Sequence, residues 1–211
     1  MSVLKIAVYP VGPLATNTYL VYDETTRKAV VIDPGLDCDV VLEAAQDLHV
    51  EHILLTHTHY DHIGGVRRFK EQTGAKIWVH ELERSWLQDP VKNLSAVAQW
   101  NPEPVTAPDA DEVWHGGERL NFLGMPVEVL FTPGHSPGHV SLKFGDVVFG
   151  GDALFAGSIG RTDLPGGDHR QLLESIRREL LALPDETRVF PGHGPATTIG
   201  DERKNNPFLQ E

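Results

Sequence analysis

One short stretch of the chain, residues 56–65, reads Thr-His-Thr-His-Tyr-Asp-His-Ile-Gly-Gly and follows an apolar run. Four imidazole or carboxylate side chains fall within six consecutive residues of it. Because an extended chain points side chains i and i+2 to the same side, His57 and His59 can converge on one cation. Asp61 and His62 come next, at the expected start of a helix, and point elsewhere, so a second cation can bind beside the first.

The donor types in this stretch indicate which cations it could hold. Neutral imidazole nitrogen and carboxylate oxygen suit zinc, iron or manganese, and zinc sites of this kind have ligand distances of about 2.0–2.2 Å. The alternative is a polar loop whose histidines only cap and form hydrogen bonds, but serine or asparagine would serve that purpose. The stretch therefore predicts a metal site that the rest of the fold must complete.

Composition narrows the class of protein. The chain has 211 residues, of which 40% are hydrophobic, enough for one large domain with a full core. Its formal charge, 18 minus 30, is −12, which disfavours a nucleic-acid partner because phosphate backbones are anionic. No apolar run approaches the roughly 18 residues that span a bilayer, and the N-terminus lacks the pattern of a signal peptide. With Cys38 as its single cysteine, the chain is expected in the reducing cytoplasm, without a membrane partner.

Hydrophobic periodicity predicts a mixed α/β chain. The expected strands are Leu4–Val8, Thr18–Tyr22, Ala29–Ile32, Ile53–Leu55, Lys76–Val79, Val127–Phe131, Val147–Phe149 and Arg188–Phe190. The expected helices are one capped by Asp37 or Asp39, one over Val66–Thr73 closed by Gly74, one over Glu81–Leu87, and one capped by Asp168 with Gln171 at its third position. Between them, residues 89–111 hold four prolines and little periodicity, which is typical of a lid or rim near a site or of a passive surface excursion.

Three more ligand types follow apolar runs in the second half. His135, Asp152 and His193 each come just past such a run, as His57 does, so strand ends would bring them to one edge of the sheets. With the first cluster they make seven ligands, enough for two metals that share a carboxylate. The other histidines are expected on surfaces or in supporting hydrogen bonds, with His139 the most ambiguous because it follows His135 so closely: His49, His52, His80, His115, His139 and His169.

The order of these motifs, Thr-His-Thr-His-Tyr-Asp-His, Pro-Gly-His135, Gly-Gly-Asp152 and Pro-Gly-His193, resembles the metallo-β-lactamase superfamily. The resemblance implies a single domain over residues 1–211 with a four-layer αββα sandwich of two mixed β-sheets flanked by helices. It implies two divalent metal ions, with zinc favoured over iron or manganese. The implied ligands are His57, His59 and His135 for one metal and Asp61, His62 and His193 for the other, bridged by Asp152.

Differences between subfamilies point to a narrower group. Flavodiiron-type members carry a glutamate at the position of His59, β-lactamases generally lack the acid at Asp152, and ribonuclease Z-like members bind tRNA, which the charge disfavours. Residues 157–164 are similar to the substrate-side loop of the glyoxalase II group and its persulfide dioxygenase relatives. Residues 198–209 are similar to the end of short, single-domain bacterial members, which have no C-terminal helical domain for glutathione.

The resemblance thus implies a metal-dependent hydrolase of hydroxyacyl thioesters, converting S-lactoylglutathione to lactate and glutathione by attack of a metal-bound hydroxide. Asp61 would orient this hydroxide or carry its proton, and Arg161 would bind a substrate carboxylate or brace the loop by pairing with Asp163 or Asp152. The thioester, with or without glutathione, is the expected small-molecule partner, and the oligomeric state is open. The alternatives are an iron-dependent persulfide dioxygenase and, more remotely, another metallo-hydrolase such as a lactonase.

Overall fold

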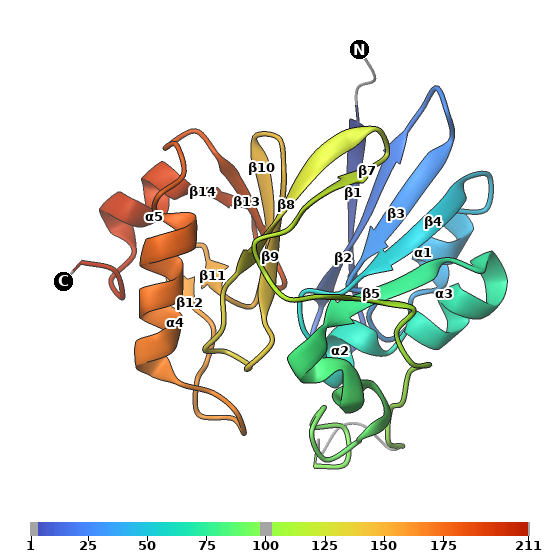
Figure 1. Cartoon of the computed structure of the whole chain (residues 1–211), viewed down its shortest axis with the longest axis horizontal. Helices are drawn as coiled ribbons and strands as arrows, with labels where there is room; N and C mark the ends of the chain where they lie inside the picture. The colour runs from blue at the N-terminus through green and yellow to red at the C-terminus, as the bar shows by residue number, and fades with distance from the viewer. Residues whose placement is uncertain (1–3, 98–102, 211) are drawn as a thin grey trace. The chain divides into compact units, whose positions relative to one another are not determined.

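The chain forms two compact units, Met1–Val113 and Trp114–Glu211, and each is built on a six-stranded mixed sheet (Figure 1). The structure is a computed structural model that describes residues 4–97 and 103–210. The expected mixed α/β class with two mixed sheets and accompanying helices is confirmed. The expectation of one domain over residues 1–211 stays a prediction.

The first unit contains a sheet whose strands follow the order β1-β2-β3-β4-β5-β6. Its strands are β1 (Leu4–Val11), β2 (Thr16–Asp23), β3 (Lys28–Ile32), β4 (His49–Leu54), β5 (Lys76–His80) and β6 (Glu112–Trp114). Its helices are α1 (Asp39–Ala44), α2 (Tyr60–Ile63), α3 (Val66–Thr73) and the 3₁₀ segment η1 (Glu81–Gln88). The pairs β1–β2 and β2–β3 are antiparallel, whereas β3–β4 and β4–β5 are parallel. Three strands therefore end at one edge.

Helix packing fixes this sheet. Val41 of α1 and Val66 and Phe69 of α3 are buried in one apolar cluster with Ile53 of β4 and Ile77 of β5. Figure 1 shows α1 and α3 beside these strands. Full burial of side chains of this size stabilises a fold by roughly 1.5–3 kcal/mol each before entropy is counted. The packed helices thus support the edge of the sheet that carries the polar residues after β3 and β4.

The second unit contains a sheet of order β14-β13-β10-β9-β8-β7 and a small hairpin. Its strands are β7 (Arg119–Phe122), β8 (Met125–Phe131), β9 (Val140–Phe144), β10 (Val147–Gly151), β13 (Arg188–Pro191) and β14 (Thr197–Thr198), with the hairpin β11 (Leu154–Phe155) and β12 (Ser158–Ile159). Its helices are α4 (His169–Ser175), continued as the π-helical turn η2 (Ile176–Leu180), and α5 (Ile199–Asn205). One apolar cluster joins Leu172, Ile176 and Ile199 to Val148 and Val189.

Most expected elements are present, with corrected ends. Helix α3 has the predicted bounds and the predicted Gly74 cap, and Asp168 caps α4 by accepting a hydrogen bond from the Gln171 amide at 2.9 Å. The predicted cap of α1 is wrong, because Cys38 occupies the cap position and Asp39 is the first helical residue. The Cys38 carbonyl accepts the first helical hydrogen bonds, and no side chain caps the helix. The predicted helix after β5 is a 3₁₀ segment.

None of the helices in the described part of the chain combines the length and the apolar character needed to cross a bilayer.

Candidate metal centre

In the first unit, parallel strands deliver the candidate residues to one edge. Asp33 follows β3, His57 follows β4, and η1 follows β5. Because β3, β4 and β5 run in the same direction, their C-terminal ends lie together, as the sequence predicted for strand-end ligands. The loops at that edge can therefore hold polar side chains close to one another on the packed sheet.

Asp33, directly after β3, is the hydrogen-bonding hub of this edge. Its Oδ1 accepts the Thr56 amide at 2.8 Å, and its Oδ2 accepts the Thr56 hydroxyl at 2.6 Å. The same Oδ2 lies 3.0 Å from Nδ1 of His62. The available signal was that the apolar run before Asp33 ends in a carboxylate, as the runs before the predicted ligands do.

These contacts determine which ring nitrogens carry protons. A carboxylate only accepts, so Nδ1 of His62 donates to Asp33. The Thr56 hydroxyl gives its single proton to Asp33, so it accepts from Nδ1 of His57 at 3.1 Å. In both rings Nε2 is then the nitrogen that keeps a lone pair. A ring nitrogen prepared in this way by an acceptor at the other nitrogen is the usual form of a metal-ligating histidine.

A buried glutamate holds the extended segment between the first two histidines. Oε2 of Glu83, in η1, accepts both the amide and the hydroxyl of Thr58, each at 2.8 Å. The ring centroids of His57 and His59, on either side of Thr58, are 4.7 Å apart, as expected for side chains i and i+2 on one side. The Trp86 ring lies 6.5 Å from that of His59. Sequence reasoning did not single out Glu83, because its partner is 25 residues away.

Asp61 and His62 lie on the short helix α2 (Tyr60–Ile63), which precedes the predicted helix over Val66–Thr73. Oδ2 of Asp61 accepts the Thr16 hydroxyl at 2.8 Å and lies 3.4 Å from Nε2 of His62. One ligand atom each from Asp33, His57 and His62 also fall within 4.8 Å of one another. Asp33 already accepts three hydrogen bonds, so its role is to orient the histidines rather than to bind an ion.

In the second unit, strand direction places the three remaining candidates together. β8 and β10 are both antiparallel to β9, and β10 is parallel to β13, so all three end at the same edge. His135, Asp152 and His193 follow these ends. Oδ2 of Asp152 lies 3.6 Å from Nε2 of His135 and 3.5 Å from Nε2 of His193. The carboxylate therefore stands between the two imidazoles.

His135 is fixed by its neighbours in the same way as His57 and His62. Its Nδ1 donates to the carbonyl of Arg161 at 2.8 Å, which leaves the lone pair on Nε2. Gly134 before it has φ +130°, and a Cβ there would overlap the backbone of Leu172 at the start of α4. The Asp168 amide also donates to the carbonyl of Gly134 at 2.8 Å. Helix α4 thus holds the loop that carries His135.

His139 has a supporting role, which resolves the ambiguity in its assignment. Its Nε2 accepts the backbone amide of Asp152 at 3.0 Å, and its Nδ1 lies 2.9 Å from the Thr132 hydroxyl. With both nitrogens engaged in a fully buried position, the ring fixes the backbone of Asp152. His80 is likewise buried, and its Nδ1 accepts the Leu82 amide at the start of η1.

Arg161 pairs with Asp163, the contact that one of its two predicted roles, bracing the loop, requires. Its Nε and Nη2 reach the two carboxylate oxygens of Asp163 at 2.8 and 2.7 Å. The hydrogen bonds from this guanidinium lower the pKa of Asp163 to about 2. Both side chains are exposed, at 63% and 68%, so the pair is screened by water. Its role toward substrate stays a prediction.

The donor geometry fits a metal. Two ligands at about 2.0–2.2 Å from a tetrahedral ion are about 3.3–3.6 Å from each other. The pairs within each unit, Asp61 with His62, Asp152 with His135 and Asp152 with His193, are 3.4, 3.6 and 3.5 Å apart. Carboxylate oxygen and neutral Nε2 are also the donor types that zinc, iron and manganese accept. The residues present therefore suit the predicted ions.

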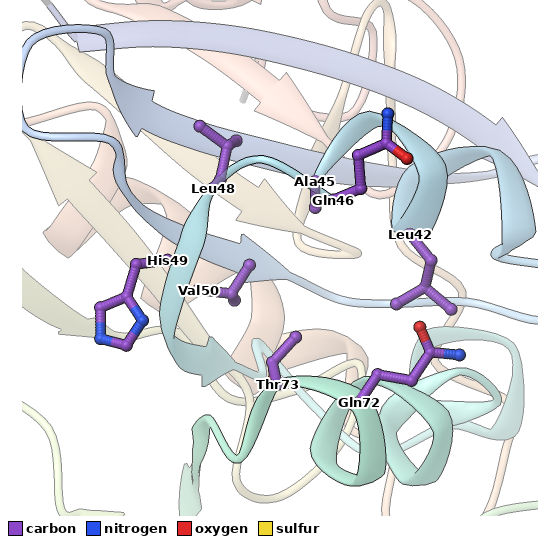
Figure 2. Close-up of a pocket in the computed structure, with 8 residues that line it drawn as sticks. All are labelled: Leu42, Ala45, Gln46, Leu48, His49, Val50, Gln72 and Thr73. Carbon is purple, nitrogen blue, oxygen red and sulfur yellow. The ribbon is translucent and has the colours of Figure 1, made fainter.

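A surface depression of about 340 Å³ lies elsewhere in the first unit (Figure 2). Its wall comes from the end of α1, the start of β4 and the end of α3: Leu42, Ala45, Gln46, Leu48, His49, Val50, Gln72 and Thr73. It includes the first residue of β4, whereas His57 follows the last. The depression is thus at the opposite end of the strand from the candidate ligands and contains none of them.

The segment 89–111, predicted to be a lid or rim, is anchored at its base. The buried Asn93 donates through Nδ2 to the carbonyls of Trp86 and Val105, and its own carbonyl accepts the Tyr60 amide at 2.9 Å. These bonds tie the segment to η1 and to the residue after His59. Residues 98–102, which include Trp100, lie outside the described residues. A lid function stays a prediction.

Comparison with known proteins places the sequence in a family. The family described as the metallo-beta-lactamase superfamily matches residues 11–193. The chain is 41% identical, over 95% of both chains, to the probable metallo-hydrolase YqgX of Bacillus subtilis (strain 168). It is 37% identical, over 98% of both chains, to the hydroxyacylglutathione hydrolase GloC of Haemophilus influenzae.

Solved structures agree with this placement. The crystal structure of the BLEG-1 B3 metallo-beta-lactamase has a TM-score of 0.93 and 42% identity, covering 98% of this chain and 100% of that one. TTHA1623 in a di-iron-bound form has a TM-score of 0.78 and 40% identity over 96% and 100%. ETHE1 from Myxococcus xanthus has a TM-score of 0.73 and 34% identity over 96% and 83%.

Proposed function

Because the chain belongs to the metallo-β-lactamase superfamily, we propose that it is a metal-dependent hydrolase of hydroxyacyl thioesters, of the glyoxalase II type. The substrate would be S-lactoylglutathione or a related small thioester, and the products lactate and the thiol. The observation that carries this proposal is the 37% identity, over 98% of both chains, with a protein named hydroxyacylglutathione hydrolase. The seven candidate ligands support it, because their donor types suit a dinuclear centre and Nδ1 of His57, His62 and His135 each has an acceptor.

In this proposal the seven candidate ligands hold two metals. One metal would be held by His57, His59 and His135, and the other by Asp61, His62 and His193, with Asp152 shared. The position of Asp152 between the two imidazoles of its own unit supports the shared role. When bound, two divalent ions polarise the thioester carbonyl and lower the pKa of a water molecule toward 7. Zinc is the favoured ion, with iron or manganese as alternatives.

The chain's own residues then have defined tasks. Water adds to the carbonyl carbon, the carbon–sulfur bond breaks with its electron pair on sulfur, and a proton of the water ends on the thiolate. We assign this proton transfer to the carboxylate of Asp61, which the Thr16 hydroxyl orients at 2.8 Å. Asp33 and Glu83 hold the histidines, and Trp86 beside His59 would exclude solvent from that side.

A second candidate is the iron-dependent persulfide dioxygenase activity of the group that the sequence resembles. The observations in its favour are the 34% identity with ETHE1 from Myxococcus xanthus and the 40% identity with a protein solved in a di-iron-bound form. The similarity to a B3 metallo-beta-lactamase makes β-lactam hydrolysis a further activity to measure. The donor set alone does not separate these reactions, because imidazole and carboxylate serve both zinc and iron.

Purified chain with measured metal content should be assayed in parallel on three substrates. We expect S-lactoylglutathione to yield lactate and glutathione in equal amounts without oxygen uptake. Asp152→Ala with matched metal content should abolish this turnover. Oxygen uptake with glutathione persulfide, together with an inert thioester, would instead identify the dioxygenase. Turnover of a chromogenic cephalosporin with both other substrates inert would identify a β-lactamase.

A further inference from the structure

The C-terminal helix α5 and the residue after it contact the hairpin β11–β12 through two buried polar side chains. Glu202 on α5 and Asn206 just after it are 3% and 0% exposed. Oε2 of Glu202 accepts the Gly157 amide at 2.9 Å, and Nδ2 of Asn206 donates to the Ser158 carbonyl at 3.0 Å. The same Nδ2 donates to Oε2 of Glu202 at 2.7 Å. We call Glu202 and Asn206 the C-terminal clasp.

The clasp grips the hairpin β11–β12. This hairpin pairs only Leu154 with Ile159 and Phe155 with Ser158. Hairpins this small are not stable by themselves, so other contacts must hold it. Both clasp residues contact its turn, because Gly157 is a turn residue and Ser158 starts the second strand. The position of the hairpin therefore depends on α5.

The hairpin in turn supports two candidate ligands. The Phe155 ring lies 6.2 Å from the His193 ring, edge to face. Directly after the hairpin, a Cβ on Gly160 would overlap the carbonyl of Asp152, and the carbonyl of Arg161 accepts the Nδ1 proton of His135. The chain leaving the hairpin is thus packed against the backbone of the bridging acid and sets the orientation of His135.

The chemistry of Glu202 indicates more than a surface contact. A buried carboxylate is costly unless donors surround it, and Glu202 has three neutral ones. The third is the Thr197 hydroxyl, which donates to Oε1 at 2.6 Å. Hydrogen bonds to a carboxylate are stronger than those between neutral groups. Such a network defines one geometry for the hairpin rather than a range of them.

We propose that Glu202 and Asn206 are positioning residues of the metal centre, acting through the hairpin β11–β12 on His135 and His193. The proposal rests on the assignment of these histidines as ligands under the proposed function and is independent of the substrate. Groups that orient metal ligands typically change metal affinity by 10–100-fold when removed. The effect should therefore appear in metal binding, without reference to turnover.

The test measures zinc affinity by competition with a chromophoric chelator at 25 °C, together with the thermal midpoint of the metal-depleted chain. Glu202→Ala and Asn206→Ala should each weaken zinc binding at least about tenfold. Glu202→Gln should stay within about threefold of the wild type. Its amide oxygen can still accept from Gly157 and Asn206, and the Thr197 hydroxyl can rotate to accept from its amide nitrogen.

Arg203→Ala is the matched control on the same helix. Arg203 donates to the carbonyls of Leu181 and Leu183 and pairs with Asp185, none of which belongs to the hairpin. It should lower the thermal midpoint but keep zinc affinity within about threefold. If Glu202→Ala does not fold, Asn206→Ala decides alone, because it leaves the bonds from Glu202 to Gly157 and Thr197 in place.

Two results would contradict the positioning role of the C-terminal clasp. One is unchanged zinc affinity in Glu202→Ala and Asn206→Ala. The other is a loss of zinc affinity in Arg203→Ala as large as in these two variants, at the same thermal midpoint. A wild-type chain that binds no zinc, iron or manganese would instead overturn the metal centre of the proposed function. The wild-type measurement therefore separates the failure of the function from the failure of the clasp.

Discussion

Three imidazoles of the candidate centre share one arrangement at the scale of single residues. Nδ1 of His57 faces a threonine hydroxyl, that of His62 a carboxylate, and that of His135 a backbone carbonyl. Each acceptor places the proton on Nδ1 and the lone pair on Nε2. Asp33 governs two of the three, because it accepts from Thr56 as well as from His62. One carboxylate thus sets the orientation of two rings.

Asp33→Asn tests this role. An amide nitrogen in place of Oδ2 cannot accept from His62, so we expect metal affinity to fall by about 10–100-fold. Asp23→Asn is the matched control, since Asp23 is a buried carboxylate of the same unit that accepts the Thr25 and Thr26 amides in a turn. It should lose stability and keep its metal. Equal metal affinity in the two variants, measured by chelator competition, would contradict the role of Asp33.

Arg161 and Asp163 allow a similar comparison. One role of the pair would be to brace the loop whose Arg161 carbonyl accepts the hydrogen bond from His135. In that case Arg161→Lys and Asp163→Asn should both lower kcat by a few-fold with KM unchanged, because each removes the bidentate contact. If Arg161 clamps substrate, Arg161→Lys should raise KM, whereas Asp163→Asn should leave Arg161 available and lower KM. Steady-state kinetics of both variants separate these outcomes.

The pKa of Asp163 also fixes the pH range of this brace. Its folded pKa of about 2 lies below the ordinary value of 3.8, so the pairing stabilises the fold at pH above about 4. The contribution is lost as pH falls from 3.8 through 2. Between pH 5 and 9 Asp163 stays ionised, so the inflections of the pH–rate profile in that range should keep their pH values in Asp163→Asn even if kcat falls.

At the scale of elements, strand direction concentrates the chemistry. β10 and β13 are parallel neighbours, with Gly151 opposite Pro191. Asp152 directly follows Gly151, and His193 lies two residues after Pro191. β8, running the same way, brings His135 to the same edge. The start of β10 lies at the other edge, where Asp146 occupies an exposed turn. The two ends of one strand therefore differ in function.

We expect Asp152→Ala to lose turnover by at least about a hundredfold, because a carboxylate between two imidazoles would be removed from both metals. Asp146→Ala, at the opposite end of β10, should keep near-normal activity. Both variants should be assayed after metal content has been brought to the wild-type level. Substantial turnover in metal-replete Asp152→Ala would contradict the shared-ligand assignment.

At the scale of the whole molecule, the family match over residues 11–193 spans both compact units. The proposed function assigns His62 and His193 to the same metal. A metal that binds the folded chain and not the unfolded one stabilises the fold, by about 2.7 kcal/mol when the free metal is at 100 times Kd. Metal binding should therefore raise the thermal midpoint of the chain. The cytoplasmic location inferred from Cys38 stays a prediction.

A double-mutant cycle tests whether His62 and His193 bind the same metal. The wild type should bind two metal equivalents, and His62→Ala and His193→Ala should each fall toward one by elemental analysis. The double variant should lose no more metal than either single one, because both changes remove the same site. His57→Ala, assigned to the other metal, should instead add its loss to that of His62→Ala. Additive losses from His62→Ala and His193→Ala would mean that they do not share a metal.

The class of fold and the seven candidate ligands could be predicted from the sequence. Strand ends are local features, and a His or Asp just past an apolar run can be found without knowing where the strand goes. Helix α3 and the Asp168 cap were predictable for the same reason, because their signals lie within a few residues. The family resemblance rested on these same short motifs.

The side chains that hold those ligands in place could be identified only from the folded structure. Asp33 and His62 are 29 residues apart, Thr58 and Glu83 are 25 apart, and Gly157 and Glu202 are 45 apart. No local period links such pairs, because the sheet register and the helix packing bring them together. A ligand is identified by its own chemistry and its strand, whereas an orienting partner is defined only by proximity. The fold therefore decided how each ligand is held.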